Sequence, residues 1–234
     1  MSRLGRAALI ILAIVLALGG IAYWQRGALA LAVWKRAVAK ALSNNLVSEL
    51  PDGLHVALCG TGSPLPDPTR AGACTAVVAG KRVFIVDAGE GSARNLAFMG
   101  LNPGRIEAIL LTHFHSDHID GLGGMMLQRW VAGARQAPVP VHGPTGVEAV
   151  VAGFNAAYAQ DQSYRTAHHG PEIVPPTGFG GSAKPFVPPA EGTVTVIDDG
   201  GLKVEAFSVT HTPVEPAVGY AFKYKGRKVV ISGD

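Results

Sequence analysis

The stretch Thr112–Gly121, with the sequence THFHSDHIDG, decides both the fold and the chemistry of this chain. Three histidines and two aspartates fall within eight consecutive positions of it. Neutral imidazoles and carboxylates are the ligands that zinc and similar divalent metals take where no thiolate is present. The preceding run Ile106–Leu111 is apolar at nearly every position, which is typical of a buried strand. The sequence therefore predicts a metal site on the loop that leaves this strand.

The spacing within this loop divides the candidate ligands into two sets. Alternate side chains of an extended backbone point to the same side, so His113 and His115 can reach one ion. Asp117 and His118 lie where the chain turns towards a helix, and they can reach a second ion. Three histidines held this close without a metal would repel one another when protonated and lose hydration when neutral. We therefore favour a metal site over a polar surface loop with chance histidines.

Outward from this loop, the pattern alternates between strands and helices. Strands are expected at 54–59, 74–78, 82–86, 106–111, 138–142, 193–197, 202–209, 218–224 and 228–231. Helices are expected at 92–99, 121–131 and 146–160. Residues 170–192 are rich in Gly and Pro and have no hydrophobic period, which predicts a long surface loop. The alternation indicates one α/β domain over residues 43–234.

The first 42 residues have a different character. Ala7–Trp24 holds 18 residues without a charge, and as a helix it would be about 27 Å long, close to the ~30 Å hydrocarbon core of a membrane. We predict a transmembrane signal anchor here, followed by a helical stalk over Gly27–Leu42. Gly20-Ile21-Ala22 also fits a signal peptidase site, so secretion after cleavage is the alternative. We expect the body to be membrane-anchored on the periplasmic, or extracytoplasmic, side.

The formal net charge of +3 conceals a division of charge along the chain. Residues 1–42 carry six of the 20 Lys and Arg and none of the 17 acids, so residues 43–234 have a net charge of −3. This acidic body lacks the global basic excess of a dedicated nucleic-acid binder. The average charge does not exclude a local basic patch. The sequence has only two cysteines, Cys59 and Cys74, which are too few to form a thiolate zinc cluster. We expect two small buried residues, with a bridge between adjacent strands as the alternative in an oxidising compartment.

Three motifs carry a resemblance to a known family. His113-x-His115-x-Asp117-His118 resembles the HxHxDH signature of the metallo-β-lactamase superfamily. Leu58-Cys-Gly-Thr-Gly-Ser-Pro64 and Val141-His-Gly-Pro144 resemble the tRNase Z and arylsulfatase-like branch. The resemblance covers about 54–234 and implies an α/β fold, the αββα sandwich of the superfamily. It also implies a hydrolase with two zinc ions.

The resemblance extends the ligand set by position. A His that follows a strand and precedes a Gly-Tyr strand is matched by His211, the implied third ligand of the first ion. The Ser-Gly-Asp turn of the branch is matched by Ser232-Gly233-Asp234, which makes Asp234 the implied bridge between the ions. Asp87 is implied to support the metal loop from behind. Asp117 is the expected catalytic residue, because it would hold the second ion and orient the attacking hydroxide.

The family pattern also needs a last His well beyond the Ser-Gly-Asp turn. The chain offers no counterpart, so we expect an incomplete sandwich whose C-terminal part is missing and a second metal site one ligand short. An inactive, truncated, membrane-tethered protein is one reading of this pattern. The histidine pair His168 and His169 lies outside the motif spacing, and we expect it on the substrate side or the surface.

The expected reaction is hydrolysis of an ester by a metal-bound hydroxide. Only 22 residues separate His211 from Asp234, too few for the tRNA-binding arm commonly inserted there in bacterial tRNase Z enzymes. Together with the acidic body and the anchor, this favours a small phosphodiester or sulfate ester as substrate. The alternative is a tRNA 3′-processing endoribonuclease, so a nucleic-acid partner stays open but is not favoured. Nothing in the sequence decides the oligomeric state.

Overall fold

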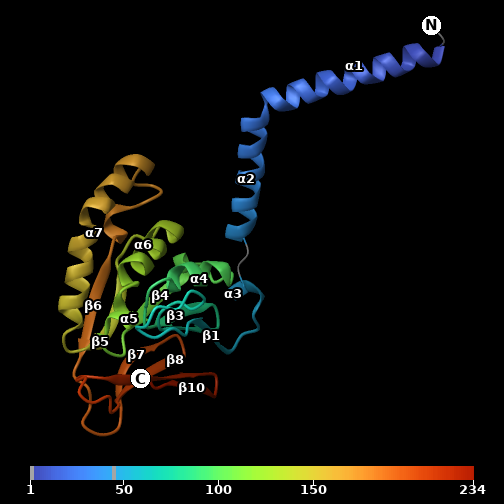
Figure 1. The fold of residues 1–234 in the computed structure, drawn as a ribbon. Coiled ribbons are helices and arrows are strands. Elements are labelled where there is room, and N and C mark those ends of the chain that lie inside the picture. The colour runs from blue at the N-terminus through green and yellow to red at the C-terminus, as the bar shows by residue number, and fades with distance from the viewer. Residues whose placement is uncertain (1–2, 44–45) are drawn as a thin grey trace. The chain divides into compact units, whose positions relative to one another are not determined.

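The computed structural model describes residues 3–43 and 46–234 (Figure 1). The chain divides into two compact units, Met1–Asn44 and Asn45–Asp234. The described part of the first unit is entirely helical and consists of α1 (Arg3–Trp24) and α2 (Arg26–Ser43). Both helices are rich in Ala and Leu, which have high helix propensity, and neither contains an acidic residue.

The predicted anchor does not take the form of one straight span. Among the described residues, no single helix is long and apolar enough to cross a membrane. Ile10–Ile21 and Arg26–Trp34 meet this test only as a pair, and the two segments are bent by 65°. Ala7–Trp24 lies within α1, which does not meet this test by itself, so the structure does not support Ala7–Trp24 as a transmembrane helix. Attachment to a membrane, and the side on which the body lies, stay predictions.

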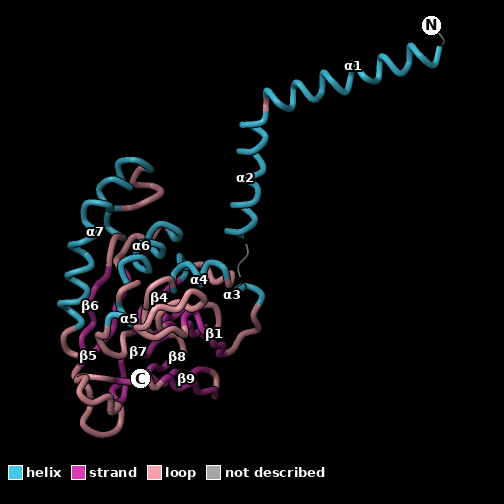
Figure 2. The backbone as a smooth tube through the Cα atoms, viewed as in Figure 1, coloured by secondary structure: helices cyan, strands magenta, loops and turns pink. Residues whose placement is uncertain are grey.

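The second unit is built on two sheets (Figure 2). The first sheet has six strands, in the order β1 (Leu54–Gly60), β2 (Cys74–Ala79), β3 (Arg82–Val86), β4 (Ile106–Leu110), β5 (Val139–Pro144) and β6 (Gly181–Phe186). Its first two strand pairs are antiparallel and the next three are parallel. The second sheet is antiparallel, in the order β10 (Arg227–Ile231), β9 (Val218–Tyr224), β8 (Leu202–Ser208) and β7 (Val194–Asp199).

Helices cover one face of the six-stranded sheet. They are α3 (Leu46–Glu49), α4 (Ser92–Phe98), α5 (Ser116–Ile119), α6 (Leu122–Gly133) and α7 (Val147–His169), with short 3-10 turns at Pro103–Arg105 and Pro176–Gly178. In the described part of this unit, helices lie on the outer side of the first sheet, whereas the outer face of the second sheet carries none (Figure 1). The layers therefore run helix, sheet, sheet.

Two hydrophobic cores hold these layers together. One lies between the helices and the first sheet and contains Leu96, Met125 and Val141. The other lies between the sheets and contains Phe84 and Phe222. In β4, Ile109 belongs to the first core and Leu110 to the second. Both faces of this strand are buried, which explains its continuous apolar sequence.

The region after residue 160 differs from the sequence prediction. Helix α7 continues to His169 and ends before Gly170. An ion pair between Arg165 Nε and Asp161 Oδ2, 2.7 Å apart and one turn away from each other, stabilises this extension. His168 and His169 are therefore helical. Part of the expected loop at 170–192 is strand β6, which pairs in parallel with β5. Because β6 is an edge strand, it tolerates Pro185, which removes a backbone donor and obscures the strand pattern.

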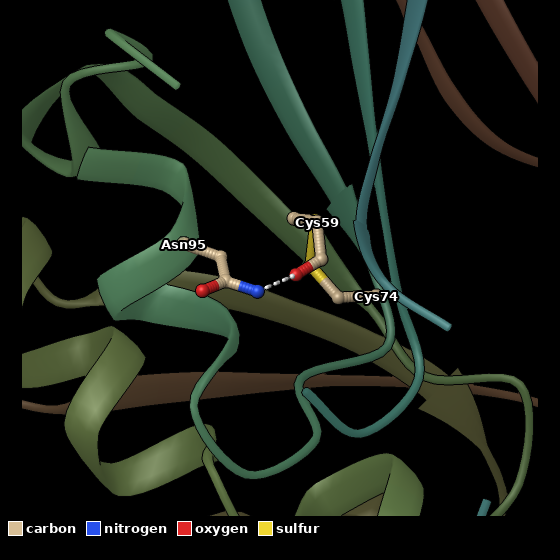
Figure 3. The surroundings of a disulfide bond; sticks show 3 residues. All are labelled: Cys59, Cys74 and Asn95. Carbon is tan, nitrogen blue, oxygen red and sulfur yellow. Dashed lines mark hydrogen bonds between the residues drawn. A yellow bond between two sulfur atoms is a disulfide. The ribbon is translucent and has the colours of Figure 1, made fainter. Parts of the chain in front are cut away.

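A disulfide joins the end of β1 to the start of β2 (Figure 3). The Cα atoms of Cys59 and Cys74 are 5.0 Å apart, and both residues are buried. Asn95 of α4 donates a hydrogen bond of 3.0 Å to the carbonyl oxygen of Cys59. The bridge closes the loop at residues 60–73. The two cysteines are thus buried, and they also form the cross-strand bond that the sequence left open.

Candidate metal centre

The metal loop begins directly after β4 and enters the short helix α5. The strand hydrogen-bonds on both sides in the middle of the sheet, so the start of the loop is rigidly placed. His211 follows β8, and Asp234 follows β10. The carboxyl ends of these strands meet at one edge of the sandwich, which brings together side chains more than 100 positions apart in the sequence.

Three of the predicted ligands form a first donor group. One nitrogen each from His113, His115 and His211 lies within 4.8 Å of the others. The rings of His113 and His211 are 4.8 Å apart between centroids, and those of His115 and His211 are 5.2 Å apart. His211 Nε2 is buried and has no hydrogen-bond partner among the described residues. A buried nitrogen without a partner is costly, and a cation would supply the missing interaction, so this donor set fits a divalent metal.

A second donor group consists of His113, His118 and Asp234, again within 4.8 Å of one another. His118 Nε2 lies 3.3 Å from Asp234 Oδ1. Asp117 Oδ2 lies 3.7 Å from His118 Nε2, but Asp117 is in neither group. The residue common to both groups is His113, whereas the sequence interpretation gave the shared position to Asp234.

Burial controls the protonation of the central histidines. Burial lowers the pKa of His113 to about 4, and the charge of His118 acts in the same direction. His113 is therefore neutral at pH 7, which leaves a nitrogen lone pair free to bind a cation. Burial also lowers the pKa of His118, but the hydrogen bond to Asp87 and the neighbouring carboxylates more than offset this, and the net shift is upward.

Asp87 supports the loop from behind. Its Oδ1 accepts a hydrogen bond of 2.8 Å from the backbone N–H of Thr112, and its Oδ2 accepts one of 2.8 Å from the Thr112 hydroxyl. His118 Nδ1 donates to the same Oδ2 at 2.9 Å. This contact leaves His118 Nε2 as the nitrogen that faces the donor group. The geometry is the one that the resemblance implied for Asp87.

Several supporting contacts were not anticipated from the sequence. The buried Tyr220 hydroxyl donates a hydrogen bond of 2.7 Å to the carbonyl oxygen of Leu111, and so joins the second sheet to the metal strand. A Cβ atom on Gly89 would lie 2.2 Å from the carbonyl oxygen of Asp117, so only glycine allows this close approach of the two loops. The spacing Asp87-Ala-Gly89 was the available signal for the second contact.

A cavity of about 480 Å³ adjoins the metal loop. Asp117 lies in its wall, together with residues of the disulfide-closed loop such as Ser63 and Arg70. The rings of His168 and His169 meet edge to face, 4.6 Å apart between centroids, at the exposed end of α7, and neither belongs to a donor group among the described residues. The cavity places Asp117 where a substrate can reach it.

Residues 67–234 match the family model of the metallo-β-lactamase superfamily, and the chain belongs to this superfamily. This confirms the mixed α/β fold expected from the HxHxDH motif. The superfamily implies divalent metal binding and hydrolase activity, and the two donor groups agree with the former.

Similar proteins indicate the branch of the superfamily to which the chain is related. It is 39% identical over 183 residues to a protein named Ribonuclease Z from Mycolicibacterium paratuberculosis, a match that covers 77% of this chain and 62% of the relative. A Ribonuclease Z from Mycobacterium bovis is 38% identical over the same length. The crystal structure of human tRNase Z, short form, has a TM-score of 0.61 and 27% identity, covering 76% of this chain and 68% of the human chain. These similarities support the tRNase Z branch, and the chain spans about 62% of the length of the curated relatives.

These relatives overturn the preference for a small phosphodiester or sulfate ester substrate, and they favour the RNA-processing alternative. The preference depended on the 22 residues between His211 and Asp234, on the average charge of the body and on the predicted anchor. None of these three features describes the metal centre itself. An average charge also hides local clusters of one sign, because electrostatic fields at a surface depend on where the charges lie.

Proposed function

We propose that this chain is a metal-dependent endoribonuclease that cleaves tRNA precursors on the 3′ side. One observation carries the proposal. The two donor groups share His113, and His118 and Asp234 of the second group line a cavity of about 360 Å³, in a chain 39% identical to a protein named Ribonuclease Z. The substrate class comes from the names of the relatives, and the donor groups supply the chemistry.

We further propose zinc as the metal. His113, His115 and His211 would hold one ion, and His118 and Asp234, with Asp117 beside them, would contribute to a second. All-nitrogen and mixed nitrogen–carboxylate sets without thiolate are typical of catalytic zinc sites. When bound, such ions lower the pKa of water towards ~7 and offset the charge that develops on phosphoryl oxygens.

The protein's own residues orient the reacting groups. Asp87 holds the ring of His118 through Nδ1, and Thr112 fixes Asp87 in turn. Asp117 faces the cavity close to His118 Nε2, and its carboxylate can accept a proton from the attacking water. The cavity volume of about 480 Å³ falls in the range of pockets that bind ligands of nucleotide size.

The proposal is tested with the full chain, zinc and a tRNA precursor that carries a 3′ extension. We expect cleavage at one position, resolved by product length on a gel. His115→Ala and Asp117→Ala should each lower the rate more than about 100-fold, whereas His168→Ala, outside both donor groups, should not. An intact precursor in a sample that hydrolyses bis(4-nitrophenyl) phosphate would contradict the proposal.

A further inference from the structure

A cluster of cationic side chains lies on the second sheet, away from the metal loop. It surrounds a cavity of about 400 Å³ at one end of β8, β9 and β10. The charged residues that line this cavity are Lys203, Lys223, Lys225, Arg227 and Lys228. They are five of the 14 Lys and Arg in residues 43–234, and no acid lines the cavity. We call these five residues the hairpin cluster.

Three members of the hairpin cluster form a row across the sheet. Lys223 of β9 pairs in register with Lys203 of β8 on one side and with Lys228 of β10 on the other. Their neighbours Val204 and Phe222 point into the inter-sheet core, so the lysines point outward. Like charges directly opposite on adjacent strands oppose sheet formation. The fold therefore carries an electrostatic cost here that an anionic ligand would relieve.

Internal acids offset only part of this charge. Glu205 pairs with Lys203 and Lys223, and Asp52 pairs with Lys225. Asp198 stands opposite Lys203 on β7. By contrast, the side chains of Arg227 and Lys228 are exposed and form no ion pair or hydrogen bond with any residue that the structure describes.

We infer that the hairpin cluster binds the phosphate backbone of RNA. This inference rests on the proposed function, and it adds a docking surface remote from the reacting centre. Strand β10 leads from Arg227 towards Asp234, and at ~3.3 Å per residue its four steps to Ile231 span about 13 Å. A folded RNA held at the hairpin could thus present its end to the metal loop. The positive cluster on a body of net charge −3 also directs a polyanion to this face.

An anionic lipid surface is the competing partner for a cationic patch. Lipid-binding surfaces combine cations with aromatic or aliphatic side chains that enter the membrane. The only aromatic residue lining this cavity, Tyr224, is half-buried and donates a hydrogen bond to Asp52. The lining of the cavity therefore favours the phosphate backbone of RNA over an anionic lipid surface.

The test is RNA binding by the full chain, measured by fluorescence anisotropy with a labelled tRNA precursor in EDTA. Arg227→Gln combined with Lys228→Gln is compared with Arg165→Gln combined with Lys184→Gln. Both pairs remove two positive charges, but the second pair lies on α7 and β6. We expect the first pair to raise Kd roughly tenfold and to reduce the slope of log Kd against log salt by about 1–2. The second pair should change neither.

The outcomes separate this inference from the proposed function. Equal binding by the two double variants overturns the docking surface, even if the wild type cleaves the precursor. Selective loss of binding in the first variant supports the surface, even if no cleavage is found. Unchanged RNA binding in the first variant, together with weaker binding to phosphatidylglycerol vesicles than the wild type but equal binding to phosphatidylcholine vesicles, overturns the inference in favour of an anionic lipid surface. Should the double variant fail to fold, Arg227→Gln alone is compared with Lys184→Gln by the same salt slope.

Discussion

At the residue scale, the hydrogen bond between Asp87 and His118 is the clearest case of one side chain orienting another towards the donor group. Asp87 is buried, and burial raises its pKa while the contact with His118 opposes that shift. Its backbone has a φ of 60°, a conformation that aspartate tolerates better than most residues. The orientation of His118 therefore depends on a residue 31 positions away in the sequence.

We expect Asp87→Asn to weaken zinc binding by about 10–100-fold, because the amide is a poorer acceptor for the His118 N–H. Competition with a chromogenic chelator measures the affinity. Asp161→Asn, on the surface of α7, is the matched control. Identical zinc affinities for the two variants would mean that Asp87 does not orient His118.

A second residue-scale prediction concerns His142, which lies on β5. Burial lowers its pKa to about 4, and the charge of Lys184 adds to the shift. Between pH ~6.5 and ~4 the unfolded chain binds the proton and the folded chain does not, so the free energy of unfolding falls as pH falls through this range. At pH 5 the loss from His142 is about 2 kcal/mol relative to pH 7.

His142→Gln should remove that part of the acid sensitivity. Urea unfolding at pH 7 and pH 5 measures it as the difference in unfolding free energy between the two conditions. His113, with a pKa also near 4, accounts for a further part, so the variant is expected to stay somewhat acid-sensitive. An unchanged pH dependence in the variant would contradict the neutral state of the partly buried His142 in the folded chain.

At the scale of elements, the loop at residues 60–73 shows how a connection becomes part of a site. The disulfide closes it, and two backbone hydrogen bonds attach it to the functional loops. Gly72 N donates to Glu90 O at 2.9 Å, and Ala73 N donates to Asp117 O at 3.1 Å. The wall of the cavity of about 480 Å³ is thus attached to the metal loop through backbone hydrogen bonds.

Reduction of the disulfide is expected to lower the free energy of unfolding by about 3 kcal/mol, since it closes a loop with a sequence separation of 15. For a body of this size the melting temperature should fall by roughly 6–12 °C. Thermal unfolding with and without dithiothreitol measures the change. The double variant Cys59→Ala, Cys74→Ala should melt at the lower temperature under both conditions. Equal melting of the oxidised and reduced wild type would contradict a stabilising bridge.

At the scale of the whole molecule, the chain joins an apolar helical unit to an acidic α/β unit that contains both donor groups. The large apolar side chains of α1 that the structure describes are more than half exposed within the chain, for example Ile11 at 62% and Val15 at 58%. Such surface is costly in water, and a lipid phase would cover it. We therefore propose that residues 3–43 attach the protein to membranes.

Co-sedimentation of the full chain with phospholipid vesicles tests this attachment. Ile11→Asp combined with Val15→Asp should shift the protein from the pellet to the supernatant, because a charge in the hydrocarbon region costs about 2.5–3.5 kcal/mol. Tyr164→Asp combined with Ile173→Asp changes two exposed apolar residues of the second unit and should have no effect. Equal partitioning of the two variants would contradict attachment through α1.

The sequence alone was sufficient for those features whose signal is local. The ligands on the metal loop lie within six positions, so their spacing identified the site and the family. The apolar run of β4 likewise predicted a buried strand. His211 and Asp234 could be assigned only through the resemblance, because nothing in their own neighbourhood marks them as ligands.

Other features depend on how distant segments pair, and only the tertiary structure decided them. Sheet packing made His113 the residue common to both donor groups and left Asp117 beside them. Strand register aligned Lys203, Lys223 and Lys228, although the sequence separates them and the average charge of the body conceals them. The physical reason is the same in each case: side chains from separate strands become neighbours only when backbone hydrogen bonds fix the register between them.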